Sequence, residues 1–205
     1  MKLIIASRNV HKIREIRAML KPLGALDLYS LIDYPDYTPP PETGVTFEEN
    51  ATIKATDAAK RLNAYVIADD SGLVVPILNG HPGVRSARYA GEEASDRDNR
   101  KKLLEALNSH REEDRDAYYE CCMVLASPEK IEKCVSARCE GRILESERGG
   151  QGFGYDSLFL KHEYNKTFAE LEEEVKNRVS HRRKALDKLL VTLESIAQEL
   201  AESQG

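Results

Sequence analysis

Two adjacent carboxylates, Asp69 and Asp70, follow an apolar run that begins at Tyr65 and precede Ser71 and Gly72. Burying one charge at the end of a strand is costly, and burying two is more so unless a cation, a proton or hydrogen bonds compensate them. The pair therefore indicates a metal site. Asp, Ser and Gly are also common in solvated turns, and residues 68–72 alone do not separate the two interpretations.

Residues 7–12 join a short apolar run to a helical pattern and could hold an anion. The first N–H groups of a helix and its dipole favour negative charge at this point, and Lys12 adds a positive charge. The segment is not a Walker A loop, because the required glycines are absent. An ordinary loop in which Asn9 caps the helix explains the same residues, so both interpretations stay open.

A glycine-rich segment at 149–156 contains two aromatic side chains and an acid, Phe153, Tyr155 and Asp156. Glycines let the backbone approach a ligand closely. An aromatic ring beside them can stack on a nucleobase, a contact worth about 1–3 kcal/mol in single-stranded nucleic-acid sites. The segment can therefore hold a base, or it is a turn whose aromatic rings pack into the core.

Two further segments carry charges that could serve a site. The loop around Glu42 places a carboxylate shortly before a helix, although taken alone the segment favours a turn in which Glu42 is solvated. Lys176, His181 and Arg182 gather around the start of the last helical pattern. Cations at that end oppose the helix dipole, so their position favours a nearby anion, whereas an exposed basic helix end is the alternative.

The elements that must position these residues alternate between strand and helix patterns, which predicts an α/β fold. Capping boxes predict helices after Thr46 and Ser95, Asn9 is expected to cap an earlier helix, and a long helix ends the chain. A hairpin around 127–129 indicates a mixed sheet. The expected strands cover residues 2–6, 26–31, 65–68, 73–78, 118–126, 131–138 and 158–161. The Asp pair would then lie at a strand end.

Composition narrows the class of protein. With 205 residues, 41% of them hydrophobic, the chain can form one large domain or two lobes of one fold. A net charge of −5 gives no long-range attraction to a polyanion, so no nucleic-acid polymer is expected as partner. The four cysteines lack zinc-site spacing and are expected as reduced thiols. No segment has the length of a signal sequence or membrane span, so we expect a cytoplasmic protein without membrane contact.

Seven segments in this order resemble the inosine/xanthosine triphosphate pyrophosphatase family, which hydrolyses non-standard purine nucleoside triphosphates. The resemblance spans nearly the whole chain. Its anchors are Ser7 to Asn9 with Lys12, Glu42 to Gly44, Thr46 to Ala51 with Lys54, Ala68 to Gly72, Ser86 to Gly91, Gly152 to Asp156, and Lys176 with Ser180 to Arg182. Two positions depart from the pattern: Ser157 stands where proline is usual, and Pro39 to Pro41 lead into Glu42.

The resemblance implies a role for each matching residue. Glu42 and Asp70 would bind Mg²⁺, and Asp70 would also activate water as the catalytic base, while Asp69 would shape the site. The implied substrate-binding residues are Ser7, Arg8, Asn9, Val10, His11, Lys12, Lys54, Ser71, Phe153, Gly154, Tyr155, Asp156, Lys176, His181 and Arg182. Among them Phe153 would stack on the base.

The resemblance also implies the architecture and the reaction. One pyrophosphatase domain, residues 1–205, would have two lobes on a long mixed β-sheet with the substrate cleft between the lobes. Water would attack the α-phosphorus of ITP, dITP or XTP, releasing pyrophosphate and the nucleoside monophosphate and so cleansing the nucleotide pool. Homodimers are usual in this family, and we expect a homodimer here.

Two other functions remain open at this point. A regulatory module could sense triphosphates without hydrolysing them, but a pure sensor has no need of both Glu42 and Asp70 beside the phosphates. A related enzyme could act on other nucleotides, such as modified pyrimidines, dTTP or UTP. Product identification and substrate profiling separate these alternatives.

Overall fold

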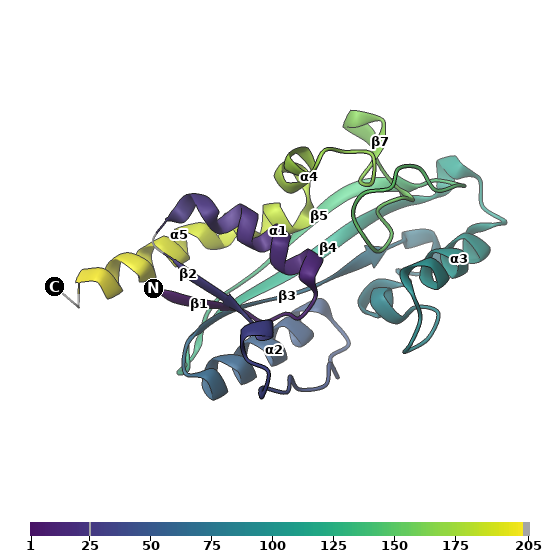
Figure 1. Cartoon of the computed structure of the whole chain (residues 1–205). Coiled ribbons are helices and arrows are strands. Elements are labelled where there is room, and N and C mark those ends of the chain that lie inside the picture. Colours follow the sequence, from purple (N-terminus) through teal and green to yellow (C-terminus); the bar gives the residue numbers. More distant parts are fainter. Residues whose placement is uncertain (25, 203–205) are drawn as a thin grey trace. The chain divides into compact units, whose positions relative to one another are not determined.

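A computed structural model describes residues 1–24 and 26–202 (Figure 1). Within them a seven-stranded sheet has the order β2-β1-β3-β4-β5-β6-β7. β1 pairs in parallel with β2 and β3, whereas β6 pairs antiparallel with β5 and β7, so the sheet is mixed as predicted. The strands are β1 (Lys2–Ile5), β2 (Asp27–Ser30), β3 (Tyr65–Val74), β4 (Asp116–Ala126), β5 (Ile131–Ile143), β6 (Phe159–Lys161) and β7 (Lys166–Thr167).

The helices begin where the caps predicted them. Asn9 accepts hydrogen bonds from the backbone N–H groups of His11 and Lys12, and both expected capping boxes are present. The α-helices are α1 (Val10–Leu20), α2 (Phe47–Leu62), α3 (Asp96–Leu107), α4 (Glu173–Val179) and α5 (His181–Glu202). In the described part of the chain, none of them combines the length and the apolar character that crossing a membrane requires.

The chain forms two compact units. Unit 1 contains Met1–Asp70, Cys121–Ala137 and the chain from Arg182 onward, and unit 2 contains Ser71–Glu120 and Arg138–His181. Strands β3, β4 and β5 contribute residues to both. The four cysteines are free thiols, as expected, and three of them are buried.

The core of unit 1 is built by strand alternation. Leu3 and Ile5 of β1 and Ile67 of β3 pack in one cluster with apolar residues of α1 and α5. Successive strand residues point to opposite faces, so Ile4 and Val66 lie on the other face, where both are fully buried. Figure 1 shows α1 and α5 on one side of these strands and α2 on the other. Both faces are therefore covered, as a parallel sheet requires.

Unit 2 has an aromatic core. Tyr119 of β4 lies 4.8 Å from Phe159 and 5.8 Å from Phe168, measured between ring centroids. Leu103 and Leu107 of α3 belong to the same buried cluster. The side of α3 that faces this core is thus fixed by packing.

The prediction that the Asp pair ends a strand and enters a Ser-Gly turn was wrong. β3 continues without interruption from Tyr65 to Val74, through Asp69, Asp70, Ser71 and Gly72. The strand tolerates both charges because alternation sends the two carboxylates to opposite faces, where each meets its own cations.

Three smaller predictions also need correction. Residues 76–78, expected in a strand, form a short 3₁₀ helix that begins at Pro76, whose ring removes a backbone donor. The second strand ends at Ser30, and residues 31–33 form another 3₁₀ turn closed by Asp33. Lys176 belongs to α4 and not to the start of the last helix, because α4 ends at Val179.

Candidate active site

Asp70 faces α2, and the helix supplies its partners. Lys54 Nζ lies 3.1 Å from Asp70 Oδ1, and Asn50 Nδ2 donates to Asp70 Oδ2 at 3.2 Å. The same Lys54 ammonium is 2.8 Å from Glu42 Oε1. Two carboxylates that are 28 positions apart in sequence thus converge on one positive charge.

The electrostatic balance at Asp70 is incomplete. Burial raises the pKa of this carboxyl; Lys54 lowers it, and Glu42 raises it again, so the pKa stands above its ordinary value. Burial alone would lower the pKa of Lys54, but the neighbouring carboxylates, Asp70 first, raise it. The ammonium of Lys54 thus lies between the carboxylates of Glu42 and Asp70, and the burial of Asp70 is only partly compensated.

Asn50 connects the Glu42 loop to β3. Its side chain is fully buried, its Oδ1 accepts from the N–H of Gly44 at 2.8 Å, and its Nδ2 reaches Asp70. A Cβ on Gly44 would lie 2.7 Å from that Oδ1, so only glycine fits this approach. The loop that carries Glu42 is thereby tied to Asp70.

The donor set at Glu42 and Asp70 fits Mg²⁺. The ion prefers oxygen ligands and is usually bound through one or two carboxylates, its other positions being taken by water and substrate phosphates. Lys54 Nζ already lies within 3.1 Å of an oxygen of each carboxylate. Across residues 1–24 and 26–202, no group of three or more His, Cys, Asp or Glu side chains could hold a metal.

Asp69 faces α1 and α5 and has different surroundings. Lys12 Nζ of α1 lies 3.0 Å from its Oδ2, and Arg182 Nε of α5 donates to the same oxygen at 3.1 Å. Arg182 also pairs through Nη1 with Glu15 of α1. Burial alone would raise the pKa of Asp69, but Lys12 and Arg182 outweigh that effect and hold it far below its ordinary value.

The loop before α1 is arranged as a helix cap. Asn9 Oδ1 accepts from the N–H groups of His11 and Lys12 at 3.0 and 3.2 Å, and Ser7 Oγ accepts from the N–H of Asn9 at 3.1 Å. Arg8 donates to the carbonyl of Tyr37 at 2.6 Å. The capping interpretation is confirmed. Phosphate binding by residues 7–12 stays a prediction, and Val10, with 61% of its surface exposed, is open to solvent.

A second cluster lies in unit 2 around Asp156, which is buried. Its Oδ2 is 2.7 Å from Lys176 Nζ and accepts from the N–H of Phe153 at 3.0 Å. Its Oδ1 accepts from the hydroxyl of Tyr119 at 3.3 Å. Lys176 Nζ also lies 5.0 Å from the centre of the Phe153 ring. Asp156 therefore contacts both the backbone of Phe153 and the ammonium group of Lys176, two residues that were predicted to bind substrate.

Two more predicted residues belong to this cluster. The His181 ring stacks on the Tyr119 ring at 4.7 Å between centroids with an interplanar angle of 10°. Tyr155 donates its hydroxyl proton to the carbonyl of Ser86 at 2.8 Å and is buried. The alternative in which the aromatic residues of the glycine-rich segment simply pack into the core thus holds for Tyr155, whereas Phe153 is partly exposed.

The predicted residues that contact one another therefore form one cluster in unit 1, divided between two faces, and one cluster in unit 2. Glu42, Lys54 and Asp70 meet on one face of unit 1, and Asp69, Lys12 and Arg182 meet on the other. Phe153, Asp156, Lys176 and His181 meet within unit 2. Ser71 follows Asp70 in β3 and is partly exposed.

Three residues with evident roles were missed from the sequence. Asn50 had a signal, because it is a polar residue three positions from Phe47 and four before Lys54, on the buried side of α2. Tyr119 had only its place in a strand of alternating pattern. Glu15 had none, since a glutamate beside Ile16 in an amphipathic helix is normally solvated.

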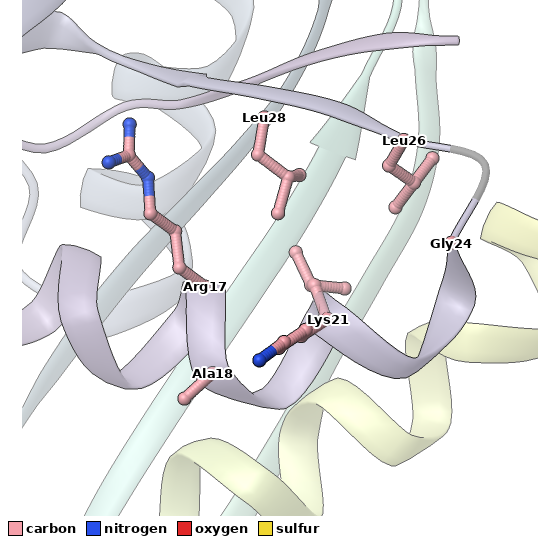
Figure 2. A pocket seen from close by; sticks show the side chains of 7 residues that line it. Arg17, Ala18, Lys21, Gly24, Leu26 and Leu28 are labelled. Atoms are coloured by element: carbon pink, nitrogen blue, oxygen red, sulfur yellow. The ribbon is translucent and has the colours of Figure 1, made fainter.

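A pocket lies elsewhere in unit 1. A pocket of about 460 Å³ opens between the end of α1 and β2. Figure 2 shows Arg17 and Lys21 on the helix side and Leu26 and Leu28 on the strand side. No predicted site residue lines it.

The fold and the two clusters define an α/β protein with paired carboxylates and lysines suited to phosphate chemistry. The Ham1 family model matches residues 3–192, and the chain belongs to the Ham1 family. A dITP/XTP pyrophosphatase of Protochlamydia amoebophila is 54% identical over 197 residues, which cover 96% of this chain and 99% of that protein. A dITP/XTP pyrophosphatase of Chlamydia caviae is 55% identical over the full length of both chains.

Solved structures agree with this assignment. The Staphylococcus aureus Ham1 protein superposes with a TM-score of 0.83 at 41% identity, covering 95% of this chain and 99% of that one. A nucleoside-triphosphatase / dITP/XTP pyrophosphatase of Mycobacterium abscessus superposes with a TM-score of 0.75 at 42% identity, covering 93% and 99%. The expected family and the mixed α/β fold are confirmed.

Proposed function

We propose that this protein hydrolyses the non-standard purine nucleoside triphosphates ITP, dITP and XTP to the monophosphate and pyrophosphate, and so cleanses the nucleotide pool. The observation that carries the proposal is the convergence of Glu42 and Asp70 on one ammonium group, in a chain about 54% identical to dITP/XTP pyrophosphatases. Metal-assisted attack on a phosphate requires carboxylates that can bind the cation, and this pair can do so.

Glu42 and Asp70 would hold Mg²⁺, which would neutralise charge at the phosphate oxygens and make the attacking water more acidic. Asp70 also serves as the base that accepts the proton of the attacking water. A cation at this carboxylate keeps it ionised, so Asp70 would accept a proton from a water that is already made more acidic.

Lys54 and Lys12 neutralise the triphosphate. Both ammonium groups are engaged with carboxylates of β3, Lys54 with Asp70 and Lys12 with Asp69. Positive charges held in place before substrate arrives need little reorganisation when negative charge develops on the phosphate oxygens. Asp69 fixes Lys12, and because Lys12 and Arg182 hold the pKa of Asp69 far below its ordinary value, this carboxylate is a weak proton acceptor.

The unit 2 cluster recognises the base. Phe153 provides a stacking surface, and the donors Lys176 and His181 favour the 6-oxo acceptor of hypoxanthine and xanthine over the 6-amino group of adenine. Adenine would leave such donors unpaired. Guanine also carries the 6-oxo group, so its rejection requires a clash or an unpaired polar group at its 2-amino position.

The test is the identity of the phosphate product. Incubation with ITP and Mg²⁺ should yield IMP and pyrophosphate, with kcat/KM at least ~100-fold above that for ATP. Accumulation of IDP and orthophosphate would refute the proposed position of attack. Binding of ITP without any product would favour a sensor, and equal hydrolysis of ATP, GTP and ITP would favour a general nucleotide pyrophosphatase.

We also propose that the enzyme is a Mg²⁺-dependent cytoplasmic homodimer. The donor set supports the ion, the sequence resemblance supports the assembly, and the location rests on the expectation drawn from the sequence. Light scattering of the protein as it elutes from a size-exclusion column should give a molar mass about twice the chain mass of 23.1 kDa. A monomeric mass would refute the homodimer and leave the activity untouched.

A further inference from the structure

Helix α3 contacts both sides of Gly154, the residue after Phe153. The N–H of Gly154 donates to Asp96 Oδ2 at 2.7 Å, and the carbonyl of Gly154 accepts from Arg100 Nη1 at 2.8 Å. Asp96 and Arg100 are four residues apart on a helix and so share one face. One face of α3 therefore clamps the glycine-rich loop beside the proposed stacking ring.

A second set of contacts anchors the C-terminal end of the loop at Ser157. Arg100 Nε lies 3.0 Å from Glu147 Oε2, and the hydroxyl of Ser157 donates to the same carboxylate oxygen at 2.8 Å. Ser157 is the residue that departs from the usual proline of the family. Its hydroxyl links the end of the loop through Glu147 and Arg100 back to Gly154.

The loop has reason to need such anchors. Gly152 and Gly154 have φ values of +77° and +62°, in the region that glycine adopts most readily. Glycines also leave the chain the largest conformational freedom, so ordering the loop costs entropy that must be offset by contacts. The Phe153 ring can stack on a base only if the backbone that carries it is fixed. Helix α3 fixes the adjacent residue, Gly154.

We propose that Asp96 and Arg100 are positioning residues for base recognition, which hold Gly154 and thereby set the place of the Phe153 ring. The inference rests on the proposed function, because it assigns these residues to the base subsite of that reaction. Since the N–H of Gly154 is committed to Asp96, the loop recognises the base through the Phe153 ring and not through this donor.

The first arm of the test is steady-state kinetics on ITP with Arg100→Ala and Asp96→Asn. KM should rise about tenfold in Arg100→Ala and about threefold in Asp96→Asn. The kcat of both variants should stay within about twofold of the wild type, because the chemistry in unit 1 is unchanged. Arg100→Lys should recover part of the loss, since an ammonium can still reach the carbonyl of Gly154. Lys101→Ala is the matched control: it removes a neighbouring positive charge of α3 that is 75% exposed and should change neither constant.

The second arm is hydrogen exchange of residues 149–157 without substrate. Exchange should be at least about fivefold faster in Arg100→Ala than in the wild type or Lys101→Ala. Unchanged exchange would overturn the clamp, whatever the activity. Faster exchange with unchanged KM would show that the clamp orders the loop without positioning the base, which also overturns the proposal.

The two proposals can fail separately. If the wild type releases no pyrophosphate from ITP, the proposed function fails, while hydrogen exchange still decides whether α3 fixes the loop. If circular dichroism shows that Arg100→Ala is unfolded, Ser157→Ala replaces it. That variant removes only the outer link and should raise KM about twofold with a smaller rise in exchange, and no change in either would refute the role of the link.

Discussion

Asp69 and Asp70 are neighbours in one strand, yet their surroundings are opposite. Asp69 meets Lys12 and Arg182 on the side of α1 and α5, and its pKa is far below the ordinary value. Asp70 shares the single ammonium of Lys54 with Glu42 on the side of α2, and its pKa is raised. The difference teaches that alternation can divide an acid pair into one carboxylate that cations compensate fully and one that they compensate only in part.

The largest effect is expected from Asp70→Asn. The amide is nearly isosteric but cannot accept a proton or neutralise a divalent cation, so kcat on ITP should fall about 1000-fold, some 4 kcal/mol in barrier. Circular dichroism should be unchanged. A loss of less than tenfold in pyrophosphate release would assign the reactive role to another group and erase the contrast with Asp69.

Glu42→Gln should have the next largest effect and should act on the metal. The Mg²⁺ concentration for half-maximal activity should rise about tenfold, because one of two charged oxygen ligands is lost. Glu48→Gln, an exposed change on α2, is the matched control and should leave the Mg²⁺ dependence as it is. An unchanged requirement in Glu42→Gln would point to a different ligand.

The smallest effect is a difference in pH dependence. The pKa of Asp69 is lowered from the model-compound value of 3.8, so its stabilising contribution is present above that pH and is lost as pH falls toward the lowered pKa. Asp70 has a raised pKa, so it is protonated at a higher pH in the folded state than in the unfolded state. Its contribution to stability therefore increases as the pH falls. Between pH 5 and pH 3, urea denaturation of Asp69→Asn should therefore show a weaker loss of stability than the wild type, by about 1 kcal/mol per pH unit at most.

Asp70→Asn should show the reverse, a slightly steeper loss over the same range. Parallel curves for the two variants would mean that the carboxylates do not differ in the way the contacts indicate. Both series use the same buffer and ionic strength, because exposed charges respond to salt.

The parts of the fold that depend on short sequence patterns were predictable. Asn9, Thr46 and Ser95 cap their helices because capping needs only residues a few positions apart. The course of β3 was not predictable in the same way. Two adjacent aspartates normally break a strand, and what keeps this one intact is a set of cations from three helices far apart in sequence.

The site was predictable by residue type and resemblance, but its internal contacts were not. The sequence pointed to Lys176 and Asp156 as substrate groups without showing that they pair with each other at 2.7 Å. Arg182 was expected among the substrate-binding residues, and the structure pairs it with Asp69 and Glu15, while its contact with substrate stays a prediction. Such pairs depend on the tertiary fold, which a pattern along one chain does not contain.

The most direct test of the division between the two aspartates is the unfolding free energy of Asp69→Asn and Asp70→Asn, measured by urea denaturation at pH 7 without Mg²⁺. Asp69→Asn leaves Lys12 and Arg182 without their shared buried partner and should lose about 3 kcal/mol. Asp70→Asn removes a carboxylate whose burial is only partly compensated and should change stability by less than about 1 kcal/mol. Equal losses in the two variants, or a larger loss in Asp70→Asn, would contradict the account.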